Sequence, residues 1–134
     1  MILPNGSMVA VVDGEKLLMF RNKAMEPHIE LVEVPHGDPD AENTGSGSRH
    51  RSSSANPDSS RQQEDDFAAS AVAYLNKQAL GGKLDHVFII ADPRTLGEMR
   101  KHFHASLEGK IVGQLAKDLT GHPVAAIEKA IAAA

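Results

Sequence analysis

A local basic cluster is the clearest candidate for chemistry in this sequence; its members are Arg49, His50, Arg51 and, further along, Arg61. Arginine binds phosphate through paired, charge-assisted hydrogen bonds, so the cluster is a candidate site for the phosphates of RNA. Gly45 and Gly47 precede it and would give the backbone freedom to approach a ligand. A second interpretation stays open: the cluster is a solvated stretch whose charges pair with the acidic residues of positions 38–42.

The cluster lies within a long polar segment, residues 35–63, which we predict to be a flexible loop. Its 29 residues include seven serines, three glycines and three prolines, and its other apolar residues are Ala41 and Ala55. So little apolar surface cannot offset the entropy lost on ordering, and so long a connection is uncommon in a compact domain unless it is functional or disordered. The segment has no aromatic residue, so it offers no platform for base stacking.

A possible anion site lies at Arg94 and Thr95, after the apolar run of residues 87–91. Ligands of α/β proteins often sit at the carboxyl ends of strands, and the free N–H groups of a helix N-terminus attract anions. Asp92 argues against an anion there, because its carboxylate would cap the helix and repel negative charge. The capped helix start is the favoured interpretation.

A metal-dependent nuclease is an alternative that needs carboxylates from distant segments to converge on two ions. The candidates are Asp13, the acidic run of residues 64–66, and Asp92. Each also has a structural explanation, as a turn residue, as first-turn charges of a helix and as a helix cap. The seven histidines are scattered, and His102 and His104 would point apart on a helix, so no metal site is predicted.

Composition limits the class of protein. A chain of 134 residues fits a single domain, residues 1–134, and a net charge of −4 disfavours nucleic-acid binding by the whole surface. The chain has no cysteine, no apolar stretch long enough to span a membrane and no cationic, apolar leader. We therefore expect a soluble, cytoplasmic protein, and no cofactor is implied.

Three strands are expected before the loop, at residues 8–12, 16–20 and 28–34, because these runs are apolar or alternate apolar with polar residues. Asp13-Gly14 between the first two predicts a hairpin with a tight turn in which both residues have positive φ. After the loop, an apolar residue at every fourth position predicts a helix over residues 64–80, and Gly81-Gly82 predicts its end.

The continuous apolar run 87–91 predicts a central strand that is parallel to a neighbour and covered on both faces. A helix from Pro93, with Phe103 and Leu107 on its buried stripe, is expected to end at Gly109. Residues 111–118 fit a strand or a helix, and their short length favours a strand; a last helix starts at Pro123. The order β-β-β-loop-α-β-α-β-α predicts a two- or three-layer α/β fold with a ribonuclease H-like mixed sheet, in the strand order 3-2-1-4-5.

Six short motifs spread over the chain carry a resemblance: Ile2-Leu3-Pro4-Asn5-Gly6, Val12-Asp13-Gly14, Gly45-Ser46-Gly47-Ser48-Arg49-His50, Ser52-Ser53-Ser54-Ala55-Asn56-Pro57, Pro93-Arg94-Thr95-Leu96-Gly97 and Lys117-Asp118-Leu119-Thr120-Gly121-His122. In these motifs and their joint spacing, the chain resembles the bacterial family of proteins required for attachment to host cells. That family is similar in turn to the middle domain of eukaryotic and archaeal peptide-chain release factors.

In release factors, the corresponding loop carries a Gly-Gly-Gln tip that promotes hydrolysis of peptidyl-tRNA at the ribosome. This chain has no Gly-Gly-Gln, and Gly81-Gly82-Lys83 lies at a predicted helix end instead. The resemblance therefore implies a contact with the ribosome, ribosomal RNA or transfer RNA rather than peptide release.

Our first hypothesis is a cytoplasmic RNA- or ribosome-associated binding module that uses residues 44–63. An enzyme, either a hydrolase of peptidyl-tRNA or a metal-dependent nuclease, is the second hypothesis, and a protein that promotes adhesion directly is the third. The sequence does not indicate an oligomeric state.

Overall fold

The computed structural model describes residues 3–35 and 57–134, and for residues 57–61 it describes the backbone alone. One five-stranded mixed sheet forms its centre, in the order β3-β2-β1-β4-β5. The strands are β1 (Met8–Val12), β2 (Leu17–Asn22), β3 (Leu31–Glu33), β4 (Val87–Ala91) and β5 (Ile111–Ala116). The α/β class and the predicted strand order 3-2-1-4-5 are confirmed.

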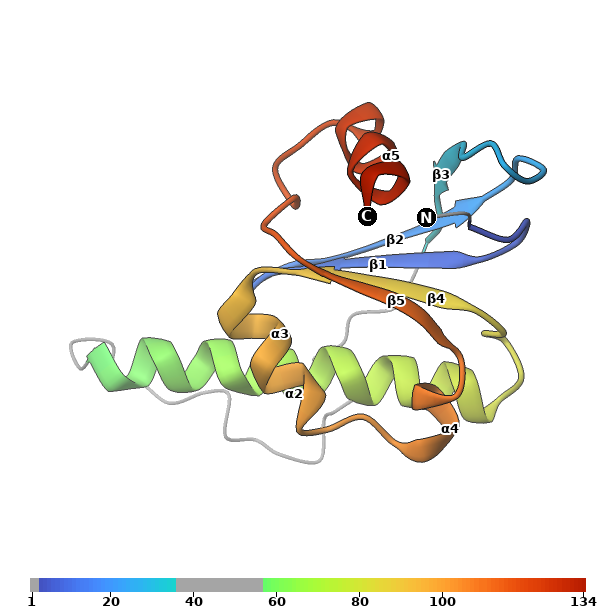
Figure 1. The fold of residues 1–134 in the computed structure, drawn as a ribbon. Helices are drawn as coiled ribbons and strands as arrows, with labels where there is room; N and C mark the ends of the chain where they lie inside the picture. The colour runs from blue at the N-terminus through green and yellow to red at the C-terminus, as the bar shows by residue number, and fades with distance from the viewer. Residues whose placement is uncertain (1–2, 36–56) are drawn as a thin grey trace.

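Helices cover both faces of this sheet (Figure 1). One face carries α2 (Pro57–Leu80), α3 (Pro93–Arg100) and α4 (Ala105–Glu108), and the other carries α5 (Val124–Ala133). The fold therefore has three layers, which decides between the two arrangements that the sequence allowed.

The two central strands, β1 and β4, are buried along their whole length. β1 is antiparallel to β2 and parallel to β4, so that Val9 faces Phe20 on one side and Phe88 on the other. β4 is also parallel to β5. The prediction that the continuous apolar run is a central, parallel strand is confirmed, and residues 111–116 form a strand as expected.

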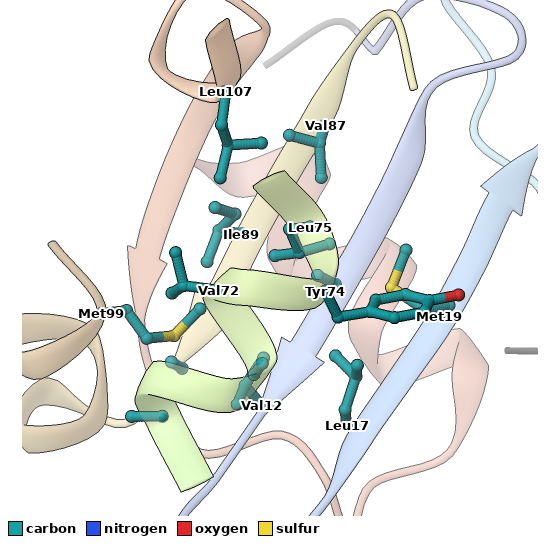
Figure 2. Packing of buried hydrophobic residues seen from close by; sticks show 14 of the residues in the cluster. Val12, Leu17, Met19, Val72, Tyr74, Leu75, Val87, Ile89, Met99 and Leu107 are labelled. Carbon is teal, nitrogen blue, oxygen red and sulfur yellow. The ribbon is translucent and has the colours of Figure 1, made fainter. Parts of the chain in front are cut away.

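Alternate residues of the strands supply two separate cores. On one face, Val12, Met19 and Ile89 pack with Val72 and Leu75 of α2 (Figure 2). The opposite face of the same strands builds the second core, whose members include Val9, Val11, Phe88, Ile90, Ile127 and Ile131. The two-residue period of a strand divides the side chains between these cores.

The β1–β2 hairpin forms as predicted, but the predicted turn chemistry was wrong. Among the described residues, positive φ occurs only at Gly6 and Gly82, so Asp13 and Gly14 do not form a type I′ turn. Instead, Asp13 Oδ1 accepts hydrogen bonds from the backbone N–H groups of Glu15 and Lys16, at 2.6 Å each. The aspartate side chain thus replaces the backbone bonds of a tight turn.

Helix α2 starts earlier than predicted. It begins at Pro57 rather than at residue 64, so residues 57–63 are helical and do not belong to the loop. Proline is favoured at the first helical position, and Gln62 Nε2 donates to Asp66 Oδ1 one turn on, at 3.2 Å. At the other end, Gly82 has φ of +73°, which confirms the predicted glycine stop.

The long helix predicted after Pro93 is broken in two. Asn76 of α2 explains the break: its Nδ2 donates to His102 O at 3.1 Å, and its Oδ1 accepts from His104 N at 3.0 Å. These bonds satisfy the backbone groups freed where α3 ends and α4 begins. Phe103, in the break, is only half-buried against the core.

Asn22 fastens two irregular segments to the end of β2 and is fully buried. Its Nδ2 donates to Leu3 O at 3.0 Å, while its Oδ1 accepts from Ala24 N at 3.1 Å and Glu30 N at 2.9 Å. Because Glu30 N is bound in this way, β3 begins at Leu31 and is shorter than the predicted strand 28–34.

We predict that Asn22→Ala lowers the free energy of unfolding by about 2–4 kcal/mol, because it leaves the buried carbonyl of Leu3 and the partly buried N–H groups of Ala24 and Glu30 without this partner. Urea denaturation followed by circular dichroism measures the change. Asn5→Ala is the control, since Asn5 is exposed and its Nδ2 makes one bond, to Ala24 O at 3.0 Å. Equal losses for the two variants would contradict the role given to Asn22.

Ser7 offers the opposite test, because its Oγ is buried and has no hydrogen-bond partner among the described residues. We predict that Ser7→Ala raises the free energy of unfolding by about 1 kcal/mol, since it removes an unpaired polar atom. Ser70→Ala is the matched control, because Ser70 is equally buried but has an interaction partner. Stability should fall in that variant, as measured by the same denaturation.

Candidate functional site

An acidic pocket lies at the carboxyl ends of the parallel strands β1, β4 and β5. It has a volume of about 370 Å³, and its lining includes Asp13, Glu64, Asp92 and Asp118. The structure therefore brings together Asp13, Glu64 and Asp92, which the nuclease alternative named, whereas Asp65 and Asp66 do not line the pocket. Within the described part of the chain, no group of three histidine, aspartate or glutamate side chains is arranged to hold a metal ion.

Thr120 joins two of these carboxylates across the pocket. Its Oγ1 lies 2.8 Å from Asp13 Oδ2 and 2.9 Å from Asp118 Oδ1, so one hydroxyl proton is shared between two acceptors. Asp13 follows β1 and Asp118 follows β5. The hydroxyl thus connects the first strand to the last one at this edge of the sheet.

Sequence reasoning missed Asp118, which lines this pocket, and Thr120, which donates to two of its carboxylates. The signal was present, because the carboxyl ends of parallel strands meet at one edge. Once residues 111–118 are taken as a strand parallel to β4, the carboxyl end of that strand, with Asp118, lies beside Asp92. Thr120 follows two residues later.

Asp92 caps α3 as predicted: its Oδ2 accepts a hydrogen bond from Thr95 N at 3.1 Å. Arg94 turns to α2 instead, where its Nη2 lies 2.9 Å from Asp65 Oδ1. The hydrogen bond with Asp65 raises the pKa of Arg94 above its ordinary value. The anion site proposed at Arg94 and Thr95 stays a prediction, and both of its residues are occupied by carboxylates of the protein itself.

Gly14 is required here by a close approach and not by its φ angle. A Cβ added to Gly14 would lie 2.7 Å from Glu64 Cγ, well inside contact distance. The turn after β1 and the first part of α2 are therefore packed directly together at the mouth of the pocket.

Comparison with known families gives a match over residues 6–131, to the model of the bacterial archaeo-eukaryotic release factor family 12. The chain belongs to this family. Its release-factor likeness, expected from the motifs, is thereby confirmed, whereas a role in host attachment stays a prediction. No curated protein matches the chain. Membership of this release factor family supports a role related to translation in broad terms.

The predicted phosphate-binding residues of this release-factor-like chain are Gly45, Gly47, Arg49, His50, Arg51 and Arg61. The first five lie outside the described residues, and Arg61 is placed only by its position in α2. The N-terminal turns of α2 extend past α3 and beyond the sheet (Figure 1). The basic segment, residues 49–51, therefore precedes in the sequence the end of α2 that projects from the sheet.

None of the helices in the described ranges has the length and apolar character to cross a membrane.

We predict that Asp13→Ala lowers the free energy of unfolding by about 1–3 kcal/mol, because Asp13 holds both the β1–β2 turn and Thr120. Asp13→Asn keeps an acceptor for the turn and should cost less. Thermal and urea denaturation measure the losses, with Asp85→Ala, at an exposed position, as the control. An Asp13→Ala loss no larger than the Asp85→Ala loss would show that this network does not stabilise the fold.

Proposed function

We propose that this protein is an RNA- or ribosome-associated binding module that contacts phosphates through residues 44–63. The observation that carries the proposal is the release-factor family match over residues 6–131, combined with the basic residues Arg49, His50 and Arg51, which precede the projecting end of α2 in the sequence. In this proposal Arg49, His50 and Arg51 contact phosphate. The protein acts in the cytoplasm, where its partners, ribosomes, ribosomal RNA or transfer RNA, are found.

The charges of the described surface favour this choice of segment. The carboxyl edge of the sheet is lined by Asp13, Glu64, Asp92 and Asp118, which repel a polyanion. Arg94, two residues after Asp92, is paired with Asp65. Residues 49–51 are therefore better suited to bind a phosphate backbone than the acidic carboxyl edge of the sheet, where α/β proteins commonly bind ligands.

Hydrolysis of peptidyl-tRNA is the second candidate, and family membership is the observation in its favour. The chain has no Gly-Gly-Gln sequence, which leaves this candidate without a named catalytic group. The nuclease alternative gains the convergence of Asp13, Glu64 and Asp92. Against it, Asp13 and Asp92 already accept hydrogen bonds that stabilise a turn and a helix start. Binding without turnover is therefore the function we propose.

We predict that the double variant Arg49→Ala, Arg51→Ala binds ribosomes or transfer RNA at least tenfold more weakly than the wild type, with an unchanged melting temperature. Each lost phosphate contact should also reduce the slope of log affinity against log salt concentration by about 0.7–0.9. Fluorescence anisotropy with labelled transfer RNA and co-sedimentation with ribosomes measure the two effects.

The matched control is Lys117→Ala, Lys129→Ala, which removes the same amount of charge from exposed positions after β5 and on α5. If this control and the arginine variant lose the same affinity, binding reflects net charge and the assigned segment is wrong. Release of peptide from peptidyl-tRNA by the wild type would favour the second candidate instead.

A further inference from the structure

A second pocket lies between the sheet and the C-terminal half of α2, at the opposite ends of the strands from the acidic pocket. Its volume is about 400 Å³. Met8 of β1 and Met19 of β2 line it from the sheet, and Tyr74 and Gln78 line it from the helix. Leu84, just after the helix, closes the apolar part.

The pocket lies between α2 and the end of β2 that carries Arg21, and Val34 and Pro35 also line it. Leu17, Met19 and Arg21 lie on one face of that strand, by its two-residue period. Tyr74 points from α2 toward β2, where Leu17 and Met19 are buried (Figure 2). Arg21, further along the strand, is exposed and stands at the rim of the pocket.

The charged residues that line this pocket are both cations, Arg21 and Lys83. Each is exposed, and neither side chain makes a hydrogen bond or ion pair with another residue in the described part of the chain. The chain as a whole carries a net charge of −4. Two cations that have no partner among residues 3–35 and 57–134, and that stand beside an apolar wall, are complementary to an anion with an apolar body.

We infer that this pocket binds a small organic acid. The apolar body of the ligand lies on Met8, Met19 and Leu84 beside the ring of Tyr74, and its carboxylate reaches Arg21 and Lys83. The pocket volume falls in the range typical of small-molecule sites, which combine apolar walls with a few polar groups that fix orientation. The arginine fork matches a carboxylate through two parallel hydrogen bonds, and the lysine adds a compact charge.

The test uses 2-naphthoate as the probe, titrated into the full ¹⁵N-labelled chain and followed by NMR. We expect saturable shifts of the backbone amides of Met19, Gln78 and Leu84, with a Kd below about 1 mM. The carboxamide 2-naphthamide has the same shape without the charge, and it should bind at least tenfold more weakly. Arg21→Gln and Lys83→Gln should each weaken 2-naphthoate about tenfold to a hundredfold, the loss expected for one charge-assisted hydrogen bond.

Lys129→Gln is the control, because it removes an exposed cation from α5, on the other face of the sheet. It should bind 2-naphthoate as the wild type does, and thermal unfolding checks that all variants are folded. Equal affinity for acid and amide, shifts confined to other surfaces, or the absence of saturable shifts would each overturn the inference. None of these outcomes bears on RNA binding by residues 44–63, since the probe and the variants are different.

Discussion

The confinement of β1 on all four sides is the constraint on which the structure depends. Its backbone is hydrogen-bonded to β2 on one edge and to β4 on the other. Its side chains alternate between the core under α2 and the core under α5. A strand in this position must be apolar throughout, because a polar side chain on either face would be buried without water. The edge strand β3 is also hydrogen-bonded to α5, which lies on the face of the sheet opposite α2. Leu31 N of β3 donates to Glu128 Oε2 of α5 at 2.8 Å.

With the middle of the sheet closed in this way, the two pockets lie at opposite ends of the strands, and the charged residues that line them differ in sign. The carboxyl end has Asp13, Asp92 and Asp118, each of which accepts hydrogen bonds from the protein itself. The opposite end has Arg21 and Lys83 beside an apolar pocket.

The sequence predicted the sheet almost completely, because strand order follows from patterns that sequence displays directly. A continuous apolar run of five residues, rich in β-branched side chains, favours a strand buried on both faces, and a hairpin followed by crossovers leaves few topologies. What it missed depends on contacts between distant residues. Gly14 was explained by a positive φ, whereas its small size is needed next to Glu64. The break between α3 and α4 depends on Asn76, which lies in another helix, so no local pattern could show it.

The candidate sites were harder to predict, for the same reason. The nuclease alternative named Asp13, residues 64–66 and Asp92 together, but Thr120 and Asp118 join them only when β5 lies beside β4. The pocket with Arg21 and Lys83 was not predicted at all. It needs the end of α2, the far end of β2 and the first residue of β1 to meet, and these segments are distant in sequence. Residues 49–51 are neighbours in the sequence, whereas Arg21 and Lys83 become neighbours of one pocket only when the chain folds.

Helix α2 runs between the two proposed binding sites, the basic segment that precedes it and the pocket that its C-terminal half lines. Its 24 residues make it about 36 Å long, so its N-terminal end, next to the basic segment, is far from the C-terminal half that lines the second pocket. Buried residues along its middle, Ala71, Val72 and Leu75, hold it rigidly against the sheet. Along α2 itself, a ligand at one end would influence the other by shifting the whole helix over the core. Because packed cores resist such movement, the two sites should bind independently, and an effect of 2-naphthoate on RNA affinity would mean that α2 has a second position on the sheet.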